Sequence, residues 1–121
     1  MAYRILVAED SDSMRQLICT TLKEEGYKVT EALDGKEAIE QMEDNEIDLV
    51  VSDLQMPNLD GIGLLKYLRG HESFKSVPVV MLTTESQYSK VVEAKKAGIN
   101  GWIIKPFAPV KLLGTVEDLL P

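Results

Sequence analysis

The sequence has 121 residues, 45% of them hydrophobic, and a formal net charge of −7, which fits one compact domain with an ordinary core. The acidic balance argues against nucleic acid as a partner, because such binding depends on lysine and arginine neutralising phosphates. No apolar stretch approaches the roughly 20 residues that span a bilayer, and the N-terminus lacks a secretion-type leader. The single cysteine suits a reducing compartment. We therefore expect a soluble cytoplasmic protein with no membrane partner.

Short β-branched runs alternate with longer helical patterns along the chain. Strands are predicted over residues 3–8, 28–32, 47–52, 77–82 and 101–104. Helices are predicted from caps at 11–13 to a stop at Gly26, from Asp34-Gly35 through Met42, over 62–69 after a cap at Asp60, over 87–97 before Gly98, and over 108–120.

The first predicted helix carries a core-facing stripe made of Met14, Leu17, Ile18, Thr21 and Leu22. The i, i+3, i+4, i+7 spacing of these positions is typical of one buried helix face. We therefore expect Arg15, Cys19 and Lys23 to lie away from the core, on a face that is either solvated or used for docking.

Five β/α units predict a parallel sheet covered by helices on both faces. Right-handed crossovers leave few topologies, and we expect an α/β flavodoxin-like, doubly wound (βα)5 fold of strand order 2-1-3-4-5 over a single domain, residues 1–121. This order places the first and third strands side by side at the switch point, where such sheets bind ligands. Glu9 and Asp10, after the first strand, would then lie next to Asp53, after the third.

Three carboxylates at one sheet edge need a physical reason, because close like charges raise each other's pKa. Taken alone, Asp53 or Asp10 could simply cap a turn or helix. Together with Glu9 they favour a site for a hard divalent cation, and oxygen ligands suit Mg²⁺. A strand-end aspartate can also act as a nucleophile and form an aspartyl phosphate.

Other strand ends add a cation, a hydroxyl and an aromatic ring. Lys105 is either an ordinary surface lysine or, before a cis Pro106, an ammonium aimed at Asp53 or a phosphoryl group. Thr83 is either a turn or cap residue or a donor to a phosphoryl oxygen. For Trp102, core packing is favoured over a role as a moving switch.

Four motifs carry a resemblance to a known family. They are Val7-Ala8-Glu9-Asp10-Ser11, Ser52-Asp53-Leu54-Gln55-Met56-Pro57 with Asp60-Gly61, Leu82-Thr83-Thr84, and Lys105-Pro106-Phe107. Each is weak alone, but all four in order at the strand ends are specific. From Tyr3 to Leu120 the chain resembles a response-regulator receiver domain of the single-domain chemotaxis (CheY-like) type.

The resemblance implies roles for the site residues. Asp53 would be the phosphorylated aspartate, and Glu9, Asp10, Asp53 and the backbone carbonyl of Gln55 would hold Mg²⁺. Thr83 and Lys105 would contact the phosphoryl group, and Trp102 would join Thr83 as the switch pair.

The resemblance also implies partners. The donor would be a phosphohistidine on a sensor histidine kinase or a phosphotransfer protein. The output would be a change in the face formed by the fourth helix, fifth strand and fifth helix, which would bind a downstream protein in chemotaxis or motility. Such a domain assists its own phosphorylation and dephosphorylation but is not a turnover enzyme, and we expect a monomer.

The sequence departs from the family pattern at three positions. Glu9 stands where the family more often has Asp, Trp102 replaces the usual Tyr or Phe, and Thr84 stands where Ala or Gly is typical. Gln55 and Glu85 occupy positions that, in the family, tune how fast the phosphate is lost.

Three alternatives remain at this point. A phosphatase of the haloacid-dehalogenase type also uses a strand-end Asp with Mg²⁺, but its second Asp would fall where the sequence has Gln55. A flavodoxin-like cofactor binder would need a Gly-rich or Ser/Thr-rich phosphate loop after the first strand. A receiver module excised from a larger regulator or hybrid kinase fits the end at Pro121 as well as a natural stop does.

Overall fold

Parallel strands alternate with helices throughout the part of the chain that the computed structural model describes, residues 2–84 and 88–121. The elements in chain order are β1 Arg4–Ala8, α1 Asp12–Glu24, β2 Lys28–Ala32, α2 Gly35–Asp44, β3 Leu49–Asp53, α3 Gly61–Arg69, β4 Val79–Thr83, α4 Tyr88–Ala97, β5 Gly101–Ile104 and α5 Pro109–Leu119. The predicted helix start at Gln87, and Glu85 before it, lie outside the described residues.

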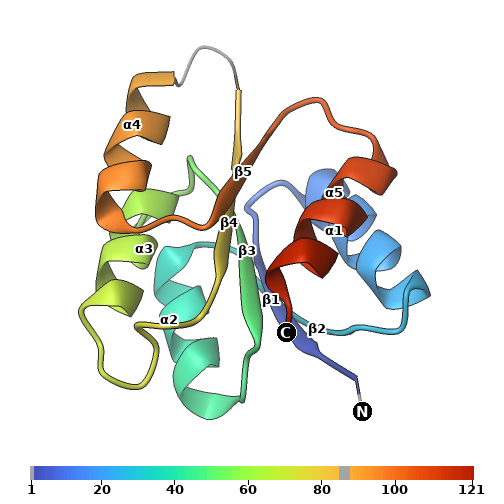
Figure 1. The fold of residues 1–121 in the computed structure, drawn as a ribbon, viewed down its shortest axis with the longest axis horizontal. Coiled ribbons are helices and arrows are strands. Elements are labelled where there is room, and N and C mark those ends of the chain that lie inside the picture. The colour runs from blue at the N-terminus through green and yellow to red at the C-terminus, as the bar shows by residue number, and fades with distance from the viewer. Residues whose placement is uncertain (1, 85–87) are drawn as a thin grey trace.

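The sheet has the order β2-β1-β3-β4-β5, with all neighbours parallel, which confirms the predicted flavodoxin-like topology (Figure 1). Ala8 of β1 pairs with Ser52 of β3, so the next residues, Glu9 and Asp53, stand at the same level at the ends of neighbouring strands. The strand register therefore brings together the acids that are 44 positions apart in sequence.

Each strand buries alternate residues on opposite faces of the sheet. Leu6, Val50 and Met81 pack with α2, α3 and α4, whereas Val7 and Val51 pack with α1 and α5. Figure 1 shows this division, with α1 and α5 on one side of the sheet and the other three helices on the opposite side. No helix in the described ranges combines the length and apolar character needed to cross a membrane.

Helix ends follow the predicted signals. The Asp60 carboxylate accepts a hydrogen bond from the Gly63 N–H at 2.8 Å and caps α3, while Gly26 and Gly98 follow α1 and α4 with φ of 92° and 100°. These left-handed conformations favour glycine because it has no Cβ.

Two strands start two residues later than predicted. β3 runs from Leu49 to Asp53 and β4 from Val79 to Thr83, so each is shifted toward the carboxyl edge. The Val77 N–H donates to the Phe74 carbonyl in a turn, and Pro78 has no N–H to offer the sheet. Asp53 and Thr83 are therefore the last residues of their strands rather than loop residues.

The prediction for the buried face of α1 is wrong in two places. Leu17, expected in the core, is 44% exposed, and Cys19, expected outside, is only 3% exposed. The buried stripe is Ile18, Cys19 and Leu22, because α1 packs against β2 and α5 as well as β1. Burial raises the pKa of the Cys19 thiol to about 11, so this cysteine stays protonated at neutral pH.

Candidate functional site

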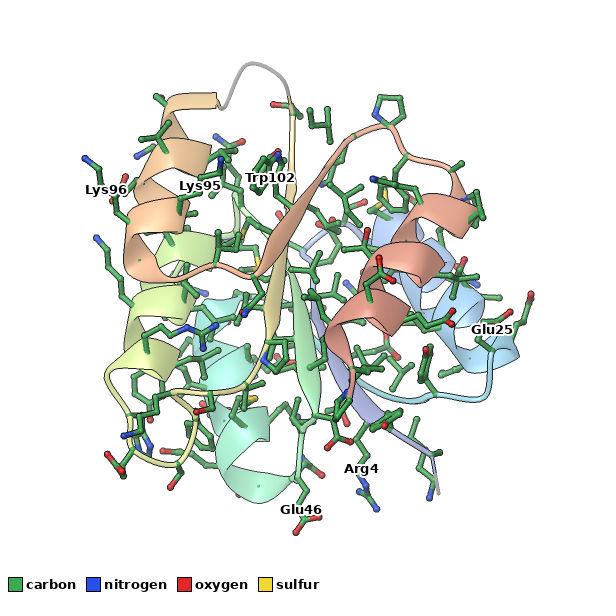
Figure 2. The ribbon with its side chains drawn as sticks, viewed as in Figure 1. Arg4, Glu25, Glu46, Lys95, Lys96 and Trp102 are labelled. Carbon is green, nitrogen blue, oxygen red and sulfur yellow. The ribbon has the colours of Figure 1, made fainter. Side chains whose placement is uncertain are left out.

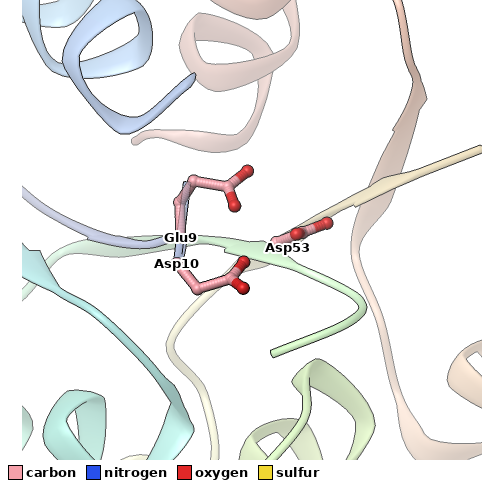
Figure 3. A group of neighbouring side chains, drawn as sticks. All are labelled: Glu9, Asp10 and Asp53. Carbon is pink, nitrogen blue, oxygen red and sulfur yellow. The ribbon is translucent and has the colours of Figure 1, made fainter. Parts of the chain in front are cut away.

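Three carboxylates meet at the carboxyl ends of β1 and β3 (Figure 3). Glu9, Asp10 and Asp53 each offer an oxygen, and these oxygens lie within 4.8 Å of one another. Glu9 and Asp53 are buried, at 1% and 7% exposure, while Asp10 is exposed. Asp10 also lines an open cleft of about 510 Å³ with Gln55, Met56, Pro57 and Asp60, so the exposed member of the cluster faces an open cleft.

Lys105 bridges the two buried acids. Its Nζ lies 3.0 Å from Asp53 Oδ1 and 3.2 Å from Glu9 Oε1, and its side chain is 20% exposed, which rules out the surface-lysine alternative. The Lys105–Pro106 peptide bond is cis, as predicted. One ammonium therefore contacts two of the three acids in the cluster.

The pKa of Glu9 is raised to about 7. The largest cause is burial, and the nearby Asp53 charge adds to it, whereas the Ser11 N–H and Lys105 act in the opposite direction. Burial lowers the pKa of Lys105, but the contacts with Asp53 and Glu9 outweigh it and the net shift is upward. Lys105 therefore stays charged, whereas Glu9 is protonated below about pH 7, and a metal ion that binds there would have to displace that proton.

The backbone around Asp53 is tightly packed. Asp53 Oδ1 accepts a hydrogen bond from the Leu54 N–H at 2.9 Å, and the Gly61 N–H donates to the Leu54 carbonyl at 2.9 Å. A Cβ on Gly61 would lie 2.5 Å from the Asp53 carbonyl oxygen and 2.6 Å from the Met81 sulfur. The absence of a side chain at Gly61 thus lets the start of α3 pack directly beneath Asp53.

Thr83 places a hydroxyl at the same sheet edge. Asp53 pairs with Leu82 across β3 and β4, so Thr83 lies one position further toward the edge. Its Oγ1 is buried and has no hydrogen-bond partner within the described part of the chain. Leaving a buried hydroxyl without a partner costs free energy, and a phosphoryl oxygen arriving at Asp53 is the kind of acceptor it lacks.

The donor set fits magnesium. The carboxylates of Glu9, Asp10 and Asp53 are hard oxygen ligands, which Mg²⁺ prefers. Within residues 2–84 and 88–121, no sulfur or imidazole belongs to this cluster. Gln55 lines the cleft beside Asp10.

Trp102 does not pack in the core, contrary to the favoured interpretation. The residue is 38% exposed, and Lys95 Nζ lies 4.2 Å from the ring centroid in a cation–π contact, which Figure 2 shows between α4 and β5. Because Met81 pairs with Trp102 and strand residues alternate between faces, Thr83 and Trp102 project to the same face of the sheet.

The helical pattern missed one residue beside the acids. Arg15, expected on the outer face of α1, donates from Nη1 to the Glu9 carbonyl at 2.9 Å. Its side chain is only 13% exposed. No spacing signal in the sequence connects a helical arginine to a backbone carbonyl, so only the structure reveals this contact.

Comparisons with known proteins agree with this geometry. The sequence profile of the response regulator receiver domain matches residues 5–117. The chain is 40% identical over 119 residues to the chemotaxis protein CheY1 of Helicobacter pylori, which covers 97% of this chain and 96% of that protein. It is 38% identical to the solved chemotaxis protein CheY4 of Vibrio cholerae, with a TM-score of 0.93 over 99% of this chain and 100% of that one.

A further solved relative contains the metal. The receiver domain of a sensor histidine kinase from Pseudomonas aeruginosa is 28% identical, with a TM-score of 0.90 over 98% of both chains. That structure has a magnesium ion coordinated in its active-site cleft.

The chain belongs to the response-regulator receiver domain family. It is a CheY-like phosphorylation switch of two-component signalling with an acidic site formed by Glu9, Asp10 and Asp53, and it is not a turnover enzyme. Family membership therefore sets aside the phosphatase and flavodoxin-like alternatives.

Proposed function

We propose that residues 1–121 act as one receiver domain in the cytoplasm, as a monomer, and accept a phosphoryl group on Asp53. The donor is a phosphohistidine on a sensor histidine kinase or a phosphotransfer protein. The observation that carries this proposal is the buried Asp53 carboxylate, 3.0 Å from the Lys105 ammonium, beside two further acids and an open cleft.

Magnesium belongs to the proposal as the cofactor. Glu9, Asp10, Asp53 and the backbone carbonyl of Gln55 are the residues that would hold it. When bound, Mg²⁺ neutralises charge on the carboxylates and on an incoming phosphoryl group. This neutralisation is needed because phosphoryl transfer depends mainly on positioning and charge stabilisation.

The protein's own residues perform the transfer. An Asp53 carboxylate oxygen forms the new bond to phosphorus as the phosphorus–nitrogen bond of the donor breaks, and the donor imidazole leaves with that electron pair. Lys105, already beside Asp53, pairs with a phosphoryl oxygen as a point charge. The Thr83 hydroxyl donates to another phosphoryl oxygen and so gains a hydrogen-bond partner, which the described residues do not supply.

Movement of Thr83 toward the phosphoryl group couples the site to Trp102. The two side chains share a face of the sheet, so the ring can turn into the space that Thr83 leaves. The resting state dominates without phosphate, and about 5.5 kcal/mol of differential stabilisation would invert a 1:99 ratio. The altered α4–β5–α5 face then binds a downstream protein.

A role in chemotaxis or motility is supported by relatives near 40% identity that are chemotaxis proteins. Restoration of swarming in soft agar, in a strain lacking its own chemotaxis regulator, tests this pathway. A chain that binds Mg²⁺ and phosphate normally but restores nothing would refute the chemotaxis role alone.

Magnesium is expected to raise the melting temperature of the wild-type protein, because a ligand that binds only the folded state stabilises it. The shift should be clearly smaller in Asp10→Asn, which removes one ligand charge at the mouth of the cleft. Asp118→Asn, the same change at an exposed position in the last turn of α5, is the matched control. Calorimetric scans without Mg²⁺, and with Mg²⁺ raised in 10-fold steps, measure the melting temperature of each protein. A wild type whose melting temperature does not change with Mg²⁺ would contradict the proposed metal site.

Thr83→Val is expected to have opposite effects on stability and signalling. The variant removes a buried hydroxyl that has no partner among the described residues, so the free energy of unfolding should rise by about 1 kcal/mol in the unliganded protein. The Trp102 response to a phosphoryl analogue should fall, because the donor to the phosphoryl oxygen is lost. Urea unfolding and fluorescence measure the two effects, and Thr83→Ser, which keeps the hydroxyl, is the control. A Thr83→Val protein that responds fully would exclude Thr83 from the switch.

A further inference from the structure

Arg15 joins three segments of the chain beside the acidic site. Its Nη1 donates to the Glu9 carbonyl at 2.9 Å, its Nη2 lies 2.6 Å from Asp12 Oδ1, and its Nε lies 3.1 Å from Glu31 Oε1. These partners belong to the loop after β1, the first turn of α1 and strand β2. The Arg15 side chain is 13% exposed.

The Glu9 carbonyl belongs to the peptide group that links Glu9 to Asp10, so the Arg15 bond acts on the backbone between two acids of the cluster. The Glu9 N–H is bound as well, to the Ala32 carbonyl of β2 at 3.0 Å. The Ser11 N–H donates to Glu9 Oε2 at 3.2 Å. The segment that presents both acids is therefore anchored on either side of Glu9.

Arg15 is not arranged as a counter-ion for the cluster. It donates to a backbone carbonyl of the site, while its charge is paired with Asp12 and Glu31, which lie outside the three-acid group. Its planar fork lets one side chain satisfy acceptors on three segments at once, which a lysine ammonium on a flexible stem does less well.

We propose that Arg15 is a positioning residue that holds the Glu9–Asp10 backbone in the arrangement required to bind the metal ion. This inference rests on the proposed magnesium binding. Groups that orient metal ligands from the next layer typically change metal affinity by about 10- to 100-fold when they are removed. Glu31 of β2 supports the same arrangement one step further away, through the Arg15 Nε.

Charge alone makes the opposite prediction for the same substitution. Removing a cation beside three carboxylates makes the site more negative, which would tighten the binding of Mg²⁺. Loss of positioning weakens it. The sign of the change in affinity thus separates the two explanations without reference to phosphorylation.

The experiment is a calorimetric titration of the metal-free protein with Mg²⁺. Arg15→Ala and Arg15→Lys are both expected to bind about 10-fold more weakly than the wild type, although only the first loses the charge. Glu31→Gln, which keeps Arg15 and its bond to Glu9, should lose less. Lys23→Ala is the matched control, since it removes the same charge from the last turn of α1 and should bind as the wild type does.

Circular dichroism of each metal-free variant separates a lost site from a lost fold. Should Arg15→Ala fail to fold, Arg15→Lys and Glu31→Gln still decide the question. Equal or tighter binding in the folded Arg15 variants, beside a wild type that binds, would overturn the positioning role and leave the proposed function intact. A wild type that binds no Mg²⁺ would overturn both.

Discussion

Replacing Asp53 by asparagine is expected to abolish the fluorescence response of Trp102 to beryllofluoride, or to a small acyl-phosphate donor, in the presence of Mg²⁺. Asparagine has nearly the same shape, but its neutral amide is a poor nucleophile and cannot balance the Lys105 ammonium 3.0 Å away. The chain has one tryptophan, so the signal has a single source. Because that ring is 38% exposed, its burial would change the emission.

The matched control lies beside the other end of the same strand. Asp48 directly precedes β3 and accepts a hydrogen bond from the Arg4 N–H at 2.8 Å, far from the acidic cluster. Asp48→Asn should respond as the wild type does. An equal response from wild type and Asp53→Asn would remove Asp53 from the mechanism, whereas a silent wild type would refute phosphoryl acceptance altogether.

Without metal, the protein is expected to become less stable as the pH rises from about 5 to 8. The pKa of Glu9 is near 4.5 in an unfolded chain and about 7 in the folded one, mainly through burial. Between these values the folded state holds a proton that the unfolded state has released. The stabilisation that comes from the raised pKa of Glu9 is therefore complete below about pH 4.5 and is lost as the pH rises through 7. It amounts to on the order of 3 kcal/mol of the free energy of unfolding.

Urea unfolding in buffers containing a chelator, at several pH values, measures this loss. Glu9→Gln cannot titrate, so its stability should show a smaller decrease over the same range, and the difference between the two proteins isolates Glu9. Adding Mg²⁺ should stabilise the wild type more at pH 8 than at pH 5, because the metal needs the charged carboxylate. Identical pH slopes in both proteins would show that Glu9 does not titrate in this window.

The sheet order and the cluster of acids could be predicted because both depend on local signals. Strand-like runs end at Ala8 and Ser52, and parallel strands deliver their carboxyl ends to one edge. Once the order 2-1-3-4-5 is chosen, Glu9, Asp10 and Asp53 must lie close together. The cis bond before Pro106 was open to prediction for a similar reason, since only the X–Pro bond adopts that form readily.

The orientation of α1 could not be predicted, because its sequence fits two buried faces. A stripe through Leu17 and one through Cys19 both have helical spacing, and these two positions point about 200° apart on a helix. The choice depends on β2 and α5, which both contact the helix. The observed orientation of α1 about its axis also directs Arg15 toward the Glu9 carbonyl.

Thr83 and Trp102 show the same limit at the level of single atoms. Their positions at strand ends follow from the pattern. The Thr83 hydroxyl, which finds no partner in the described part of the chain, and the exposed Trp102 ring depend on the space that neighbouring segments leave. Alternation along a strand predicts the face of the sheet on which a side chain lies. It does not predict which neighbouring residues pack against that side chain.

The contact between Lys95 and Trp102 affects how much of the Lys95 charge the resting surface presents to a partner. While the ring lies 4.2 Å from the Lys95 ammonium, part of that positive charge is covered by an aromatic face. Inward rotation of the ring would uncover it on a protein whose overall charge is −7. The activated form would then recruit an acidic ligand through an attraction that added salt weakens, and the resting form would show a shallower dependence on ionic strength.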